Sequence, residues 1–287
     1  MENKKYKIEL KIIPDFEGEV VKPPITVRTD KRKKAPVAKG NPFQITRNQH
    51  LLPKKILDRI SGNRKLLDVV SLRHKIKTHV STDNPLFCVN RCWDENCETK
   101  ISKPIEDDFQ RLCDKIESNT EMSFSKDQND ICNRLYNLWY LRGNFSKNPL
   151  NDIYLSKIKT FSTIEQMKKD ELEKNNIIYG ENGKIDSRFI HGLIINHELK
   201  TLMDKSYKYW YIWVFEEGDY IFSIIPLFQA IPVTRNIVLM PIPQNKSRNE
   251  NRTTKSFNRQ IIEKSYKYSD IFASYNIDNC LGIRADI

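Results

Sequence analysis

The clearest folding signal in this 287-residue chain is the stretch Ser102-Lys103-Pro104-Ile105-Glu106-Asp107-Asp108-Phe109-Gln110-Arg111-Leu112-Cys113-Asp114-Lys115-Ile116. Its apolar residues recur at helical spacing, which predicts an α-helix with one buried stripe. Ser102 is the expected N-cap, and three acidic residues follow near the positive end of the helix dipole. We expect Pro104 to break any helix that approaches from upstream.

A second helix is predicted immediately downstream. Ser125 and Gln128 form a capping-box pattern, and Gly143 is the residue at which the helix is expected to stop. The side chains expected to point inward are Ile131, Leu135, Leu138 and Trp139. Further helices are predicted over residues 163–174 and 187–205.

Strands are predicted on both sides of these helices. Upstream, a helix opening at Pro53 precedes strands at 65–71, 74–80 and 85–90. Downstream, two aromatic runs flank Glu217-Gly218-Asp219 and predict a hairpin of strands 210–215 and 220–224. A strand over 236–241 and a last helix containing Ile261, Ile262, Tyr268, Ile271 and Phe272 complete the pattern.

This order of elements predicts the α+β class: short N-terminal strands, central helices, a late antiparallel sheet and a closing helix. Late strands can pair with early ones, so residues 41–287 are interpreted as a single α+β domain. Residues 1–40 are interpreted as a basic N-terminal arm with one strand, because residues 6–12 alternate apolar and polar side chains.

The composition indicates a folded protein outside the membrane. Hydrophobic residues make up 39% of the chain, enough for a packed core. No run approaches the roughly 18 apolar residues that a membrane span needs. The first residues lack the apolar stretch of a secretory signal, so we expect a cytoplasmic protein with reduced cysteines.

The net charge of +11 predicts a polyanionic partner, most simply nucleic acid. The equally weighted alternative is a solvated, lysine-rich surface. The basic residues expected to contact nucleic acid are Lys31, Arg32, Lys33, Lys34, Arg248, Arg252, Lys255 and Arg259.

Several segments resemble one bacterial family, the domain of unknown function 4238. The shared motifs are Gln49-His50-x-x-Pro53, Phe87-Cys88, Arg91-Cys92-Trp93-Asp94, Glu98, Ile105-Glu106-Asp107-Asp108-Phe109-Gln110 and Leu138-Trp139-Tyr140-Leu141-Arg142. The likeness covers roughly residues 45–280. Family members often carry an aspartate on a late strand, whereas residues 221–226 here contain no acid. The resemblance implies a setting among mobile elements or bacterial defence, but no particular reaction.

The polar residues shared with the family are the candidate catalytic residues: His50, Arg91, Asp94, Glu98, Glu106 and Asp107. They include an imidazole for proton transfer, carboxylates for a divalent metal and a guanidinium for phosphate charge. Each also has a structural interpretation as a helix-end or ion-pair residue. A zinc site at His74, His79, Cys88, Cys92 and Cys97 is disfavoured, because the spacing fits no zinc motif.

Two functions follow as hypotheses. The first is a nucleic-acid-acting, nuclease-like protein that would use Mg²⁺ or Mn²⁺. The second is a non-catalytic interaction protein that binds nucleic acid or a protein partner. No Walker A loop, nucleophile elbow or His-Glu-x-x-His motif is present to decide between them.

Overall fold

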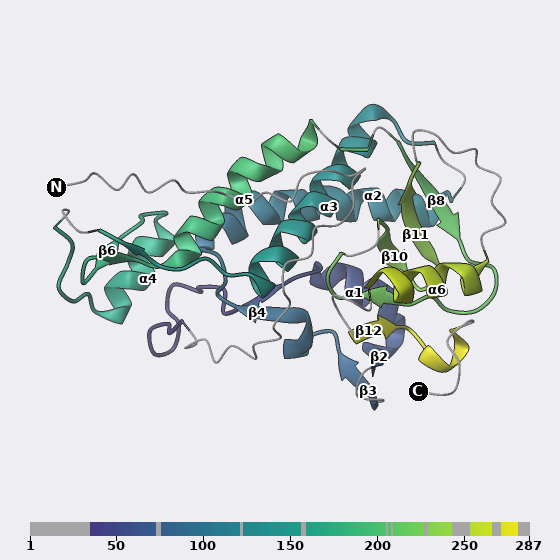
Figure 1. Cartoon of the computed structure of the whole chain (residues 1–287), viewed down its shortest axis with the longest axis horizontal. Helices are drawn as coiled ribbons and strands as arrows, with labels where there is room; N and C mark the ends of the chain where they lie inside the picture. Colours follow the sequence, from purple (N-terminus) through teal and green to yellow (C-terminus); the bar gives the residue numbers. More distant parts are fainter. Residues whose placement is uncertain are drawn as a thin grey trace, which may run out of the picture. The chain divides into compact units, whose positions relative to one another are not determined.

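The computed structural model describes residues 35–72, 76–120, 123–155, 159–204, 206–207, 209–226, 229–242, 253–265 and 271–280. The fold of these residues is α+β, with helices and several antiparallel sheets (Figure 1). The strand predicted at 6–12 lies outside them. None of the described helices has the length and apolar character to cross a bilayer.

The described α-helices are α1 (Lys54–Ser61), α2 (Lys103–Ser118), α3 (Lys126–Lys147), α4 (Gln166–Lys174), α5 (Ser187–Met203) and α6 (Thr254–Ser265). α3 packs against both α2 and α5. The capping box of α3 is confirmed, because the Ser125 hydroxyl accepts from the Gln128 backbone N–H and the Gln128 side chain accepts from the Ser125 N–H.

Gly143 was wrongly predicted to end α3, which continues to Lys147. A β-carbon on Gly143 would lie 2.7 Å from Cγ2 of Ile225. The glycine therefore permits a close approach of the 221–226 segment to the helix and does not act as a C-terminal cap.

The break expected at Pro104 is also absent. Helical structure begins at Glu95, passes through the π-helix η3 (Cys97–Ser102) and continues into α2. The Lys103 N–H bonds to the carbonyl of Glu98, five residues back. The widened turn leaves room for a proline, which has no N–H to donate. Ser102 is thus buried within a helix and is not an N-cap.

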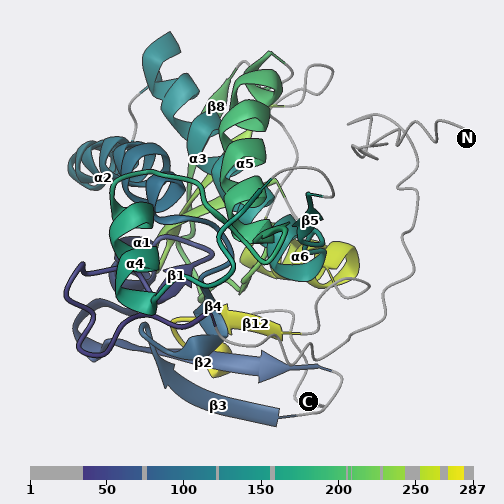
Figure 2. The same ribbon diagram turned by 90° about the vertical axis from the view of Figure 1, so that its left-hand side faces the viewer.

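One sheet joins the two ends of the described chain. Its strand order is β3 (Ile76–Ser81), β2 (Leu66–Ser71), β12 (Ile271–Ser274) and β9 (Phe222–Ser223), with antiparallel pairing throughout. Figure 2 shows β3, β2 and β12 side by side. Ile271 and Phe272 therefore lie in a central strand and not in the closing helix that was predicted. The expected pairing of late strands with early ones is confirmed by β12 and β2.

The predicted hairpin of 210–215 with 220–224 is wrong. β8 (Trp210–Val214) pairs with β11 (Ile237–Pro241), which also pairs with β10 (Ile231–Thr234). The segment between the two aromatic runs is held elsewhere: Thr254 donates to the Glu217 carbonyl, and the buried Asp219 carboxylate accepts from Arg235 and Asn279. These side-chain contacts draw 220–224 away from β8.

Two small sheets complete the fold. β1 (Asn48–His50) pairs with β4 (Cys88–Asn90), and β7 (Lys184–Ile185) lies between β5 (Ile153–Tyr154) and β6 (Gly180–Glu181). Short 3₁₀ turns are η1 (Gly62–Arg64), η2 (Pro85–Phe87) and η4 (Ile277–Asn279). The strand predicted at 85–90 is thus a strand only over its second half. One core cluster contains buried residues from Leu51 to Cys280.

Candidate functional site

The first half of the site is a strand pair that fixes His50. On β1, the buried Gln49 side chain donates to the Trp93 carbonyl across 2.9 Å and accepts from the Trp93 N–H across 3.2 Å. Strand alternation turns the next side chain, His50, to the opposite face. His50 lies opposite Cys88 of β4 in the strand register. The two residues therefore have separate roles. The Gln49 amide anchors Trp93, whereas the half-buried His50 imidazole lies on the other face of the strand.

The contacts of His50 indicate its tautomer. Nε2 lies 3.3 Å from the backbone carbonyl of Thr82, which can only accept a hydrogen bond. The ring proton therefore belongs on Nε2, and Nδ1 is the unprotonated nitrogen. Burial lowers the pKa of His50, and the carbonyl contact and the carboxylates of Asp83 and Glu98 counter this only in part. His50 is consequently a neutral imidazole with a basic Nδ1 at neutral pH.

The second half of the site is centred on Arg142 of α3, whose side chain is 1% exposed. Its Nη1 donates to Oε1 of Glu106 across 2.6 Å, and its Nη2 lies 3.4 Å from Oε2 of Glu98. The guanidinium also lies over the Trp93 ring, 5.1 Å from its centroid. Trp93 in turn donates its indole N–H to the same Glu98 oxygen across 2.6 Å.

Glu98 and Glu106 reach one guanidinium because η3 and α2 form a continuous helix. Both carboxylates remain partly exposed, at 20% and 25% of their side-chain surfaces. Burial raises the pKa of the Glu98 carboxyl, although Arg142 and the Trp93 indole favour its charged form. Glu98 therefore holds a proton more readily than an ordinary glutamate does.

The two halves are linked through electrostatics, since the charges of Glu98 and Arg142 are among those that act on the pKa of His50. The structure therefore groups three of the six candidate residues, His50, Glu98 and Glu106. Arg142 was not among the site residues predicted from the sequence. The available signal was its place in the Leu-Trp-x-x-Arg segment that resembles the family.

Arg91 and Asp94 belong to a different, buried network. Arg91 donates to the Glu173 carboxylate on α4 and to the Pro36 carbonyl, and Arg188 of α5 also bonds to Glu173. Arg91 is thus an ion-pair residue, with its partner on α4, 82 positions later in the sequence. The network connects residues near position 36 to α4 and α5.

Asp94 directs its carboxylate toward Gly192 of α5, where a β-carbon would lie 1.8 Å from Oδ1. Oδ1 is buried and has no hydrogen-bond partner among the described residues. Burial, followed by the charge of Glu173, raises the pKa of Asp94 to about 6. Asp94 is therefore a packing residue at a helix crossing and is not part of the His50 group.

Asp107 lies apart from both groups, on the surface of α2. Its carboxylate oxygens are 3.6 Å from Nζ of Lys55 and 3.4 Å from Nζ of Lys103. Pairs of this exposed kind contribute little to stability or to chemistry.

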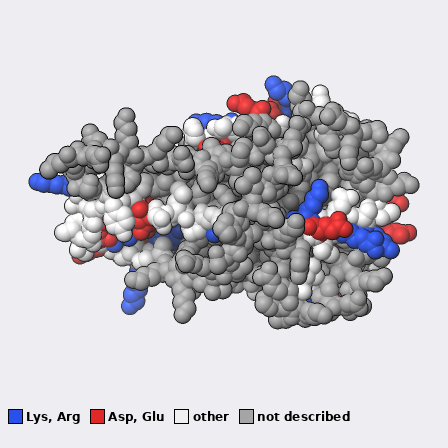
Figure 3. Space-filling view, viewed as in Figure 1, with Lys and Arg blue, Asp and Glu red and all other residues white. Residues whose placement is uncertain are grey.

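The predicted nucleic-acid contacts are only partly described. Lys255 and Arg259 are exposed on α6, one helical turn apart, whereas Lys31–Lys34, Arg248 and Arg252 lie outside the described residues. Of the 48 basic and 37 acidic residues, 28 and 27 lie within the described ranges, which are thus almost neutral. In Figure 3, described basic and acidic side chains lie close together on the face shown. The positive excess of the chain resides in the remaining segments.

Metal ligands are not grouped in the described ranges, where no three His, Cys, Asp or Glu side chains lie together in a suitable arrangement. Cys92 and Cys97 are buried, and His79 binds Asp68 at 2.6 Å. His74 lies outside the described residues. The oxygens of Glu98 and Glu106 that face Arg142 are already in hydrogen bonds.

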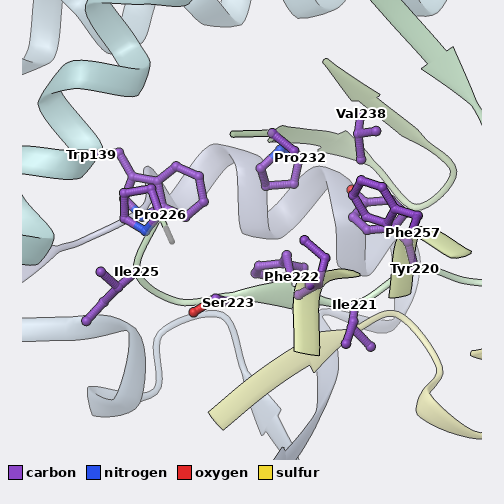
Figure 4. A pocket seen from close by; sticks show the side chains of 12 residues that line it. Trp139, Tyr220, Ile221, Phe222, Ser223, Ile225, Pro226, Pro232, Val238 and Phe257 are labelled. Carbon is purple, nitrogen blue, oxygen red and sulfur yellow. The ribbon is translucent and has the colours of Figure 1, made fainter. Parts of the chain in front are cut away.

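The segment that lacks the family's aspartate lines an apolar recess. Its walls include Phe222, Ile225 and Pro226, with Trp139 at one end and Phe257 at the other (Figure 4). The Ser223 hydroxyl is buried and has no partner among the described groups. The recess offers no acid or base for chemistry.

Comparison with known proteins identified no relative: no family model, no curated protein and no solved structure matches this chain. The resemblance to family 4238 therefore stays a prediction from the motifs.

Proposed function

We propose that this protein hydrolyses nucleic acid by acid–base chemistry, with His50 as the proton acceptor and Glu98 as the proton donor. The observation that carries the proposal is the buried Arg142 guanidinium held by Glu98 and Glu106, with the pKa of Glu98 raised and its charge felt by the half-buried, neutral imidazole of His50. Burial keeps the His50 imidazole unprotonated at neutral pH and raises the pKa of Glu98 from its usual acidic value, and a base and an acid held in these forms suit general acid–base catalysis.

Each residue has a defined role in this proposal. Nδ1 of His50 takes the proton of an attacking water, while Nε2 keeps its bond to Thr82 and fixes the ring. Protonated Glu98 gives its proton to the departing oxygen. Arg142 and the Trp93 indole hold Glu98 in place. Glu106 balances the buried charge of Arg142 and acts as a positioning residue.

Nucleic acid is the proposed substrate because of the basic surplus outside the described ranges. Residues 28–34 contain five basic residues and one acidic residue, and residues 246–252 add three basic residues and one acidic residue. Lys255 and Arg259 on α6 continue the second segment. Polycationic segments bind phosphates with a steep dependence on salt.

The test is cleavage of labelled single-stranded DNA, duplex DNA and RNA by purified full-length protein, with and without Mg²⁺ or Mn²⁺. His50→Ala and Glu98→Gln should each lower the cleavage rate by about 100-fold or more. His197→Ala is the matched control, because His197 is an exposed histidine of α5 outside this group. Absence of cleavage on every substrate, or full activity of His50→Ala, would rule out the catalytic proposal.

A non-catalytic interaction protein is the second candidate. It is favoured by the use of Arg91, Asp94 and Arg142 in buried contacts that hold the fold. Salt-sensitive binding of nucleic acid without cleavage, equal for the wild type and His50→Ala, would select this function. Absence of nucleic-acid binding would instead direct attention to a protein partner.

A further inference from the structure

Three segments that are distant in the sequence bring two arginines to one tyrosine. Arg64 is the last residue of η1, Arg235 lies in the turn between β10 and β11, and Tyr275 follows β12. Cζ of Arg64 lies 4.8 Å from the centroid of the Tyr275 ring, and Cζ of Arg235 lies 4.4 Å from it. Both distances are in the range of cation–π attraction. These three side chains form one packed group, the Tyr275 cluster.

Buried groups fix the Arg64 guanidinium in this cluster. Its Nη2 lies 3.0 Å from Oδ1 of Asp68, whose side chain is 2% exposed, and its Nη1 donates to the Tyr275 carbonyl across 2.7 Å. Asp68 is itself held by the Ile277 N–H and by Nδ1 of His79. Arg64 is therefore set in place by the fold, and part of its side chain still reaches the surface.

Arg235 is held in the same way but is more open. Its Nε donates across 2.9 Å to Oδ1 of the buried Asp219, whose other oxygen accepts from Asn279. The Arg235 side chain is 53% exposed, and among the described residues neither Nη1 nor Nη2 has a hydrogen-bond partner. A guanidinium anchored through Nε keeps a pair of donors whose spacing matches two oxygens of a phosphate.

The opposite charges of this region differ in their exposure. The carboxylates of Asp68 and Asp219 are buried beneath the cluster, whereas the guanidinium groups that they hold reach the surface. Lys65, the residue after Arg64, is also exposed. The carboxylate of Asp278 on η4 is exposed as well, and it pairs with the ammonium group of Lys77. The cluster therefore presents positive charge beside an aromatic ring.

We propose that the Tyr275 cluster binds single-stranded nucleic acid. Arg235 takes a phosphate through Nη1 and Nη2, and an unpaired base stacks against the Tyr275 ring and the guanidinium beside it. In a duplex the bases stack on one another, so the cluster should prefer a single strand. An acidic polypeptide would use the cations and leave the aromatic ring without a role.

The inference rests on the proposed function for its choice of nucleic acid as the polyanion, but it assigns binding to residues outside the acid–base site. β3 and the turn after it connect the two places. His79 bonds to Asp68 beneath the cluster, and Thr82, three residues later, contacts His50. Cα atoms three residues apart are at most about 11 Å from each other. A strand bound at the cluster therefore needs only a few nucleotides to reach His50.

The test is fluorescence anisotropy of labelled single-stranded DNA, single-stranded RNA and duplex DNA with the full-length protein at several salt concentrations. Tyr275→Leu should weaken binding of single strands about tenfold and leave duplex binding within about twofold of the wild type. Arg235→Gln should weaken single-strand binding by a similar factor. It should also reduce the slope of log K against log salt by about 0.7, the share of one phosphate contact.

Tyr154→Leu and Arg111→Gln are the matched controls and should bind like the wild type. Tyr154 is 77% exposed on β5, and Arg111 is an exposed arginine that pairs with Asp108 on α2. Far-UV circular dichroism establishes that each variant is folded. Tyr275→Leu keeps every charge, so it provides a test even if Arg235→Gln fails to fold.

A wild type that binds no single strand overturns the proposal, and so do folded cluster variants that bind single strands as the wild type does. An equal loss on duplex DNA for Tyr275→Leu, or an equal loss on polyglutamate, would assign the surface to another partner and overturn it as well. Cleavage by His50→Ala is scored separately. Binding that depends on the cluster, without any cleavage by the wild type, supports this inference and rules out the catalytic proposal alone.

Discussion

The guanidinium of Arg142 on α3 donates to the Glu106 carboxylate on α2 across 2.6 Å, with the arginine side chain 1% exposed. This contact joins α2 to α3, and Glu98 adds a second carboxylate at 3.4 Å. Removing the arginine would leave two partly buried carboxylates that repel each other. The pair therefore serves the fold whether or not the site is catalytic.

Arg142→Met should lower the free energy of unfolding by about 3 kcal/mol, because it leaves uncompensated charge in a partly buried place. Arg134→Met is the matched control on the same helix, since Arg134 is 41% exposed and lies 3.8 Å from Asp108. The control should cost under about 1 kcal/mol. Urea denaturation measures both, and equal losses would show that Arg142 has no special structural role.

Glu173→Gln should destabilise the protein by a similar amount, about 3 kcal/mol. Its buried carboxylate accepts from Arg91, Arg188 and the Glu95 backbone N–H. Neutralising it removes the negative charge that compensates two buried guanidinium groups. Glu171→Gln, on the same helix, changes an exposed carboxylate that pairs only with Lys168 at 2.9 Å among the described residues. Its melting temperature should be unchanged, whereas a comparable fall in both variants would contradict the assignment.

The helices could be predicted where local rules act within a few residues. The apolar stripe of α2 and the capping box of α3 lie inside the elements that they specify. The end of α3 could not be predicted, because the role of Gly143 depends on its close approach to Ile225, which lies 82 positions later in the sequence. The predicted hairpin of 210–224 was also wrong because of contacts distant in the sequence. Asp219, between the two predicted strands, is held by Asn279 and Arg235.

The candidate site was likewise predictable only where local sequence determines it. The residue types at His50, Glu98 and Glu106 indicated acid–base chemistry, but nothing local indicates that Arg142 joins the two glutamates. The motif around Arg91 also predicted a site residue. Its burial against Glu173 depends on the packing of α4, which no short-range pattern encodes.

Gly143→Ala should lower the free energy of unfolding by about 1–3 kcal/mol, because the new methyl group meets Ile225 at 2.7 Å and its neighbour Pro226 at 3.3 Å. Helix propensity alone predicts a gain of about 1 kcal/mol, so a measured loss isolates the steric effect. Adding Ile225→Ala removes the methyl carbon that is contacted and should recover part of the loss. Thermal melting of the single and double variants measures this, and a stabilised Gly143→Ala protein would contradict the packing described.

Asp94→Asn should stabilise the protein above about pH 6 and have little effect below about pH 4. The folded pKa of Asp94 is raised from 3.8 to about 6, chiefly by burial. Between these values the folded state binds more protons than the unfolded state, so the contribution of Asp94 to stability is present at low pH and is lost as the pH rises through 6. Asparagine never ionises, so the gain should approach about 3 kcal/mol at neutral pH.

Denaturant titrations of the wild type and Asp94→Asn across about pH 4 to 8 measure this difference. Asp107→Asn is the control, because it makes the same change at a carboxylate on the helix surface that faces Lys55 and Lys103. A gain for Asp94→Asn that is equal at all pH values would mean that the amide makes a new contact, whereas a gain confined to high pH identifies the buried charge as the cause. The second result would establish that ionised Asp94 costs the folded state stability, which separates it from the group of His50 and Glu98.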